Sequence, residues 1–346
     1  MSIERIVDPH PKETTQSAAD TADHTEMPRI PPVEKFLRGV ISVIGCPLTF
    51  VQAILSRYTL HKYQAPGDII YIGSHRLHAI VTGSSNHLPT IILESGMGGG
   101  ALDWSLVQPE LSKHTRVLSY DRAGFGWSTT TTKDPTCEGS VRELRSLLSQ
   151  LNISPPYILV GHSYGGMIMR LFAAESPEEV SGVVLVDSTH ESRFLGPAMN
   201  QGRKKSRSRH HNSLRLGYLF SPIGLPRLLK QHIGVKRMPP PIQRKVRELG
   251  YRNHAYKAAY LESLGASRSA VQLKNSTPLK SSLPLIVLTA GKQSEDWLET
   301  QKELLHVTNH TKQIIVEESW HSIQLYKPQA VIDSVIELLQ GMNLSK

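Results

Sequence analysis

The sequence predicts an α/β protein with a mostly parallel sheet flanked by helices. The first observation is a series of short runs that are apolar on both faces, as in strands covered by helices on two sides. The second is that segments with an apolar repeat of helical spacing alternate with these runs. The third is length, because 346 residues can bury the core of one enlarged domain or of a domain with an insertion.

The predicted elements follow one another regularly from residue 67 onwards. A hairpin is expected first, with strands at residues 69–72 and 77–81 around a Gly-Ser turn. Later strands are expected at 90–95, 116–120, 157–162, 180–186, 285–290 and 313–316, and helices at 138–151, 296–306 and 328–339 and directly after residue 163. The alternation stops between residues 191 and 282, where no strand-like run occurs. An insertion is therefore expected there.

Two segments precede the predicted domain. Residues 1–35 are rich in Pro and polar residues, so a disordered leader is expected, without the basic and apolar start of a signal peptide. Residues 36–66 are expected to form an apolar helical segment, in which the eighteen positions between Arg38 and Arg57 carry no charge. This length is about the minimum for crossing a hydrocarbon core. Three interpretations stay open: a helix on or in a membrane, a helix packed on the domain, and an apolar arm over the insertion.

Positive charge is concentrated in one region. The net charge is +9, and residues 193–257 contain sixteen Lys and Arg against one acid, Glu248. Such a regional excess creates a surface field, which makes an anionic membrane surface or an acidic substrate a candidate partner. Nucleic acid is disfavoured, because the basic run 203–209 has no interleaved aromatic residues. The two cysteines imply no disulfide framework. An intracellular location is favoured, and membrane association through residues 36–55 is one of the open interpretations.

One motif organises the predicted sheet. It is the run Gly161-His162-Ser163-Tyr164-Gly165, which ends the strand that starts at residue 157. The spacing Gly-x-Ser-x-Gly, between a strand and a helix, predicts a sharp turn that lifts the serine hydroxyl clear of the backbone. A side chain at either bracketing glycine would crowd this turn, and strained backbone is expected at the serine. The helix N-terminus would favour a developing anion, so Ser163 is predicted to be a nucleophile.

These residues resemble the nucleophile elbow of the α/β-hydrolase superfamily, in its serine esterase and lipase branch. A second run, 121–128, is similar to a turn of the same family, in which Asp121 and Arg122 would anchor a loop. The resemblance implies an oxyanion hole made by the backbone N–H groups of Met97, in a glycine-rich loop, and Tyr164. It also implies a core at residues 67–190 and 283–346, with a basic helical lid, residues 191–282, between strands 6 and 7.

The resemblance further implies a catalytic triad. Ser163 would be the nucleophile, and His321, just past the last strand, would be its general base. The acid stays open between two residues. Asp187, directly after the strand 180–186, is preferred, and Asp296 is the alternative, because the position where many relatives have an aspartate is Ser294. No metal or organic cofactor is implied.

The implied activity is that of a serine hydrolase. Its substrate would be a carboxylic ester of a small or lipid-like hydrophobic molecule, cleaved through an acyl-enzyme. Serine rather than aspartate at the elbow disfavours haloalkane dehalogenase and epoxide hydrolase chemistry. Two alternatives remain open: acyl transfer with the same residues, and a catalytically inactive binding protein with this fold.

Overall fold

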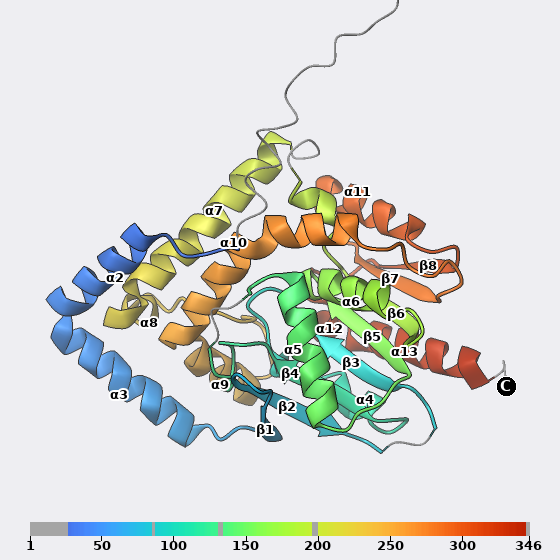
Figure 1. Cartoon of the computed structure of the whole chain (residues 1–346), viewed down its shortest axis with the longest axis horizontal. Helices are drawn as coiled ribbons and strands as arrows, with labels where there is room; N and C mark the ends of the chain where they lie inside the picture. The colour runs from blue at the N-terminus through green and yellow to red at the C-terminus, as the bar shows by residue number, and fades with distance from the viewer. Residues whose placement is uncertain (1–26, 85–86, 131–133, 196–199, 344–346) are drawn as a thin grey trace, which may run out of the picture.

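The computed structural model describes residues 27–84, 87–130, 134–195 and 200–343. Most of the predicted leader, residues 1–26, lies outside the described residues. An eight-stranded sheet in the order β1-β2-β4-β3-β5-β6-β7-β8 forms the centre of the molecule (Figure 1). Its strands are β1 (Asp68–Tyr71), β2 (Arg76–Thr82), β3 (Thr90–Glu94), β4 (Val117–Asp121), β5 (Tyr157–His162), β6 (Val180–Val186), β7 (Leu285–Ala290) and β8 (Thr311–Val316). The predicted α/β class is therefore confirmed.

The sheet is antiparallel at one edge and parallel elsewhere. The hairpin β1–β2 is antiparallel, and β2 is also antiparallel to β4, whereas all pairings from β4 through β3 to β8 are parallel. The carboxyl ends of the parallel strands thus meet at one edge, where ligands bind in open α/β sheets.

Helices cover both faces of the sheet. The helices α5 (Cys137–Gln150), α6 (Tyr164–Glu175) and α10 (Asn253–Asn275) pack on one face, and α4 (Gln108–Leu111), α12 (Ile323–Tyr326) and α13 (Pro328–Asn343) on the other. Within β5, Leu159 belongs to the first core cluster, and Ile158 and Val160 belong to the second. Because side chains alternate between two buried faces, the central strands read as continuous apolar runs.

The described residues between β6 and β7 form helices and turns. They include α7 (Gln201–Phe220), α8 (Leu225–Leu228), α9 (Pro240–Gly250) and α10. The basic run 203–209 thus lies in a helix, although a solvated loop is the commoner state for such a run. A role of this insertion as a lid stays a prediction. After β7, α11 (Glu295–Glu303) lies next to the insertion.

The N-terminal segment differs from the prediction. It forms two helices, α2 (Pro32–Ile44) and α3 (Cys46–Lys62), where the sequence predicts one segment that begins at residue 36. The chain bends at Gly45, whose Cβ, if present, would lie 2.5 Å from the Ile223 side chain of the insertion. Within the described part of the chain, no single helix is long and apolar enough to cross a membrane. The pair α2 and α3, bent by 97°, passes that test of length and composition only when taken together.

Candidate active site

Ser163 lies on the turn between β5 and α6, at the carboxyl edge of the sheet. Its backbone has φ 52° and ψ −121°, in a region that non-glycine residues rarely adopt. A Cβ on Gly165 would lie 2.6 Å from the carbonyl oxygens of Glu94 and Ser95, and a Cβ on Gly161 would lie 2.6 Å from the Gly166 Cα. The two bracketing glycines are therefore required by close backbone approach. The predicted strain at the serine is observed.

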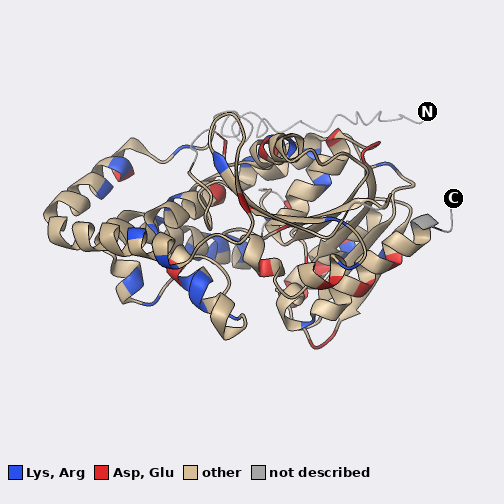
Figure 2. Cartoon of the chain, turned by 90° about the horizontal axis from the view of Figure 1, so that it is seen from below, with Lys and Arg blue, Asp and Glu red and all other residues tan. Residues whose placement is uncertain are grey.

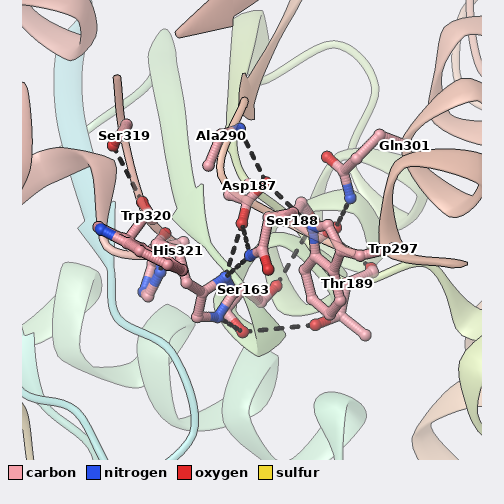
Figure 3. A network of polar contacts seen from close by, with 12 residues as sticks. Ser163, Asp187, Ser188, Thr189, Ala290, Trp297, Gln301, Ser319, Trp320 and His321 are labelled. Carbon is pink, nitrogen blue, oxygen red and sulfur yellow. Dashed lines mark hydrogen bonds and ion pairs between the residues drawn. The ribbon is translucent and has the colours of Figure 1, made fainter. Parts of the chain in front are cut away.

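His321 reaches Ser163 from the other end of the chain (Figure 3). It follows β8, and its Nε2 lies 2.9 Å from the Ser163 Oγ. The imidazole of His162 donates from Nε2 to the backbone carbonyl of His321 over 3.0 Å and so holds the loop that carries the base. Burial lowers the pKa of His162 well below its usual value, with a further contribution from His321, so His162 stays neutral near pH 7.

Asp187 is the carboxylate that the structure brings to this histidine. It follows β6, is fully buried, and its Oδ2 lies 2.7 Å from the His321 Nδ1. Three further donors satisfy the carboxylate: the Gln293 side-chain amide at 2.6 Å, the Trp297 indole N–H at 3.0 Å and the Ala290 backbone N–H at 3.0 Å. These bonds fix the orientation of Asp187 toward the imidazole, as an orienting acid requires.

Asp296, the alternative acid, lies elsewhere. Its oxygens accept hydrogen bonds from Arg203 at 2.7 and 2.9 Å, and from Arg193 and Asn200. The bond from Arg203 lowers the pKa of Asp296, with further contributions from Asn200 and Arg193. Asp296 therefore ties α11 to the insertion and is held away from His321.

The loop that contains Met97 lies against the serine. A Cβ on Gly96 would be 3.1 Å from the Ser163 Cβ, so the backbone of residue 97 is adjacent to the nucleophile. Tyr164 is the first residue of α6, and its N–H is one of the helix donors without an intrahelical acceptor. The two predicted donors thus come from segments that flank Ser163, as an oxyanion hole requires.

Arg122 anchors the loop that contains Met97. Its guanidinium donates to the carbonyl oxygens of Ser95 and Gly96, at 2.7 Å each, and forms an ion pair with the buried Glu94. It also forms an ion pair of 2.7 Å with Glu262, which extends from α10 of the insertion. Burial alone would lower the pKa of Arg122, but the Glu262 and Glu94 carboxylates outweigh it and raise that pKa well above its usual value. The anchoring role expected of Arg122 is observed.

Glu262 links the insertion directly to this loop. One of its carboxylate oxygens pairs with Arg122, and the other accepts from the Gly98 backbone N–H at 3.1 Å. The residues before and after Met97 are therefore both fixed by buried polar groups. Asp121 plays a similar part on the next turn, where it accepts from the Ala101 and Trp127 backbone N–H groups.

A small cleft adjoins the loop that contains Met97. Residues 98–100 form one wall, and Ile233, Val246 and Leu249 of the insertion form another. Asp103, which is buried, also lines the cleft; burial raises its pKa to about 7, helped by the nearby charge of Asp121. The carboxyl groups of Asp103 and Asp121 therefore line the cleft together with these apolar side chains.

Several residues that position the candidate site belong to no sequence motif and could not be predicted from the sequence. Gln293 and Trp297 hold Asp187, yet each stands in a loop or helix without a motif. Glu262 lies in the insertion, where the family pattern is absent. His162 lies inside the elbow motif, and its position there is the one available hint. Among the described residues, no group of three His, Cys, Asp or Glu side chains is arranged to hold a metal ion.

The fold and the Ser163 turn together define a class of protein. A parallel sheet with a serine on a sharp strand-to-helix turn at its carboxyl edge is the architecture of the α/β hydrolases. A family model described as alpha/beta hydrolase fold matches residues 89–306. The chain therefore belongs to the alpha/beta hydrolase fold family, and this membership supports a hydrolytic function.

The chain is also similar to uncharacterized proteins and, in fold, to a solved structure. The chain is 26% identical over 250 residues to the uncharacterized protein YqjL of Bacillus subtilis, a match that covers 70% of this chain and 80% of that protein. It is 31% identical over 229 residues to an uncharacterized protein of Schizosaccharomyces pombe, covering 63% of this chain but 40% of that protein. A solved thermophilic esterase from Thermogutta terrifontis is similar in fold, with a TM-score of 0.58, 21% identity, and coverage of 77% and 94%.

Proposed function

We propose that the protein is a serine hydrolase that cleaves a carboxylic ester through an acyl-enzyme. One observation carries the proposal: an unbroken chain of contacts from Ser163 Oγ to His321 Nε2, at 2.9 Å, and from His321 Nδ1 to Asp187 Oδ2, at 2.7 Å. At these distances the three side chains lie within hydrogen-bond reach of one another, which supports the roles of nucleophile, base and orienting acid. The family membership agrees with this chemistry.

In the first half of the reaction, Ser163 attacks the ester carbonyl. His321 accepts the hydroxyl proton at Nε2, and Asp187 stabilises the resulting imidazolium through Nδ1–H. The negative charge that develops on the carbonyl oxygen is stabilised by the backbone N–H groups of Met97 and Tyr164. When the tetrahedral intermediate collapses, the imidazolium returns its proton to the departing alkoxide, which leaves as an alcohol.

The second half repeats these steps with water. His321 removes a proton from a water molecule, the hydroxide attacks the acyl group on Ser163, and the serine oxygen leaves with the proton from the imidazolium. The apolar cleft beside residues 98–100 favours a hydrophobic acyl or alcohol part. An alcohol in place of the water gives acyl transfer with the same residues, and a protein with an unreactive serine would serve as a binding module.

Labelling with a fluorophosphonate tests the reactive serine. Wild type, Ser163→Ala and the control Ser146→Ala, on α5, are treated with the probe and assayed on p-nitrophenyl esters from acetate to palmitate. Labelling and hydrolysis in wild type and the control, but not in Ser163→Ala, support the proposal. Absence of labelling in folded wild type contradicts it and favours the binding module. Faster product formation with added alcohols than with water favours acyl transfer.

A further inference from the structure

The helices α2 and α3 expose apolar side chains on their outer surface. Phe36 is 69% exposed, Ile44 80% and Phe50 67%. The other large apolar residues exposed on the pair are Val33, Leu37, Val40, Val43, Leu48, Val51, Ile54, Leu55, Tyr58 and Leu60. Scattered apolar residues are normal on a protein surface, but a contiguous set over two helices marks an interaction surface. We call this set of residues the apolar face.

The buried side chains of the two helices are polar, and Ile41 alone among their large apolar residues packs against a buried apolar cluster. Glu34, 5% exposed, forms an ion pair of 2.6 Å with Arg215 and accepts from the Tyr260 hydroxyl at 2.7 Å. Gln52, 2% exposed, donates to the Tyr251 carbonyl oxygen at 2.8 Å and accepts from Arg227. The usual arrangement of a surface helix, with apolar residues inside and polar residues outside, is thus reversed.

These inward contacts hold the pair firmly on the insertion. Arg38 donates to the Ser221 hydroxyl at 3.0 Å and lies over the Tyr218 ring, 4.4 Å from its centre. Removing one partner of such a contact destabilises the protein, because it leaves the buried Glu34 or Gln52 side chain without a partner. The apolar face therefore cannot turn inward without breaking these contacts. Its outward orientation is a fixed property of the fold.

The apolar face has a basic border. In Figure 2 the helix pair forms one end of the molecule and is mostly uncharged, with blue and red positions on α2, and blue positions of the insertion lie next to it. The sole acid of residues 27–62 is Glu34, which is buried, whereas Lys35, Arg57 and Lys62 are exposed on the pair. Charge at the exposed border is therefore uniformly positive.

The insertion continues the apolar face. The turn that starts α8 contacts α3, because a Cβ on Gly224 would lie 3.3 Å from the Gln52 amide oxygen. Leu228 and Leu229, which follow, are 78% and 60% exposed, and the exposed Lys230 comes directly after them. In the basic run, by contrast, Arg203 and Arg207 turn inward to Asp296 and Ser267, so only its other bases can reach an outside partner.

We propose that the apolar face, together with Leu228 and Leu229, docks on the surface of an anionic lipid bilayer. Apolar side chains would enter the boundary between headgroups and acyl chains, and the basic border would contact lipid phosphates. A second copy of this chain fits less well, because it would bring the same positive charge to the interface. The inference does not rest on the proposed hydrolase function.

The bend between α2 and α3 determines the orientation of the helix pair relative to the bilayer. Helices of 13 and 17 residues are about 20 and about 26 Å long, shorter than the hydrocarbon core of about 30 Å. The insertion contacts α2 through α7 and residues 221–223, and contacts α3 through residues 221–223 and α9. The two helices meet at 97°. The geometry therefore favours a helix pair lying in the interface plane rather than a span.

Vesicle flotation of the full chain tests the inference. All proteins carry Ser163→Ala, so that hydrolysis of lipid cannot affect the result, and binding to phosphatidylcholine vesicles is compared with binding to vesicles containing 30% phosphatidylserine. The apolar variant combines Phe36→Ser, Ile44→Ser and Phe50→Ser. Its matched control combines Ile69→Ser, Tyr71→Ser and Ile315→Ser, which replace exposed apolar residues of the edge strands β1 and β8.

A second pair of variants tests the basic border. One combines Gln substitutions at Lys35, Arg57, Lys62 and Lys230, and its control combines Gln substitutions at exposed lysines outside the helix pair and α8, namely Lys113, Lys280, Lys302 and Lys312. Each base near an anionic surface contributes roughly a fivefold change in affinity. The border variant should therefore lose its preference for phosphatidylserine, and its control should keep it.

The outcomes separate three occupants of the apolar face. A loss of vesicle binding of at least tenfold in the apolar variant, with its control unchanged and circular dichroism preserved, supports docking on lipid. Equal binding by the apolar variant and its control overturns the inference. Failure of the parent protein to bind either vesicle also overturns it, and sedimentation then shows whether a dimer, absent in the apolar variant, covers the face. Parent and wild-type chains should bind equally, which keeps this result independent of catalysis.

Discussion

The site around Ser163 and the α2–α3 pair both contain buried polar groups, but these groups have different roles. At the site, polar contacts hold reactive side chains in place: four donors hold Asp187, and Arg122 with Glu262 holds the loop of Met97. In the helix pair, polar contacts of Glu34 and Gln52 hold a scaffold whose outer surface is apolar. In both regions, buried polar contacts fix the position of a segment. The accessible groups of that segment, a serine hydroxyl in one region and apolar side chains in the other, indicate its function.

The energetics of the two regions also differ. A buried carboxylate is tolerated only when donors or cations compensate for lost hydration. Asp187 and Glu34 both meet that condition. The backbone of Asp187, at the edge of the sheet, is strained, with φ 42°. Strain of this kind persists where the surrounding structure over-determines it, which is typical of functional sites. Glu34 lies in regular helix, as expected of a purely structural anchor.

The largest expected effect separates the two candidate acids. Asp187→Asn should lower kcat by about 10⁴-fold, because the amide no longer stabilises the imidazolium and favours the wrong tautomer. Asp296→Asn, the matched control, should lower kcat by less than about tenfold, since its partners are Arg203 and Arg193. Steady-state kinetics on a p-nitrophenyl ester measures both. A larger loss in Asp296→Asn would mean that the acid differs from the one seen here.

The sequence alone could locate Ser163 and His321 but could not decide the acid. Serine and histidine each stand at a position that the chain pattern defines, after β5 and after β8. Asp187 and Asp296 both follow strands at the same edge of the sheet, so position alone does not separate them. The difference lies in partners from distant segments: Arg203 holds one carboxylate, and Gln293 and Trp297 hold the other. Such contacts depend on tertiary packing that no local pattern encodes.

Asp103 is a third buried carboxyl, and its pKa is raised by burial and by the nearby charge of Asp121. In the folded state the pKa is about 7, against about 3.9 for an unperturbed aspartate. The folded protein therefore binds more protons than the unfolded chain between these values, and stability falls as pH rises from about 4 to about 7. Between pH 5 and pH 7 the loss is about 2 kcal/mol in free energy of unfolding.

The variant Asp103→Asn isolates this group. It should remove most of that loss while leaving the titration of all other residues unchanged, so the difference between variant and wild type should grow as pH rises. Urea unfolding at pH 5, 6 and 7 measures the difference. A constant offset across this range would show that Asp103 is already charged in the folded protein.

Glu262 tests whether the insertion positions the oxyanion loop. Glu262→Gln keeps one acceptor but loses the ion pair with Arg122, so the Gly98 and Met97 backbone should become less fixed. We expect kcat to fall roughly 10- to 100-fold, less than the loss of an oxyanion donor itself, with little change in KM. Glu191→Gln is the control, because it removes a buried ion pair with Arg170 that does not touch the loop. Equal losses of kcat in both variants would show a general packing effect.

The fold could be predicted more completely than the N-terminal pair. The apolar runs of β3 to β8 are long enough to specify strands, and helical spacing located α5 and α13 within a few residues. The bend at Gly45 was missed because it depends on close approach to Ile223, some 180 residues away in the chain. The apolar pattern showed that residues 36–55 contain few polar groups. It could not show that those few groups face inward.

The smallest expected effects concern the free energy of unfolding, to which a polar residue of α3 should contribute more than an apolar one. In an ordinary helix a buried apolar residue contributes more to stability than a polar one. On α3, Gln52→Ala should lower the free energy of unfolding by about 1–3 kcal/mol, because the Tyr251 carbonyl loses its donor in a buried setting. Phe50→Ser, on the exposed side, should change it by less than about 0.5 kcal/mol.

Urea unfolding in detergent-free buffer compares the two variants, with Val51→Ser as a second exposed control. If Phe50→Ser destabilises the isolated chain more than Gln52→Ala, the aromatic ring is packed against protein in solution, and the apolar face is covered by its own chain or a second copy. If the predicted order holds, the fold itself gains almost nothing from Phe50. The side chain is then held at the surface by its polar neighbours for an interaction that lies outside the chain.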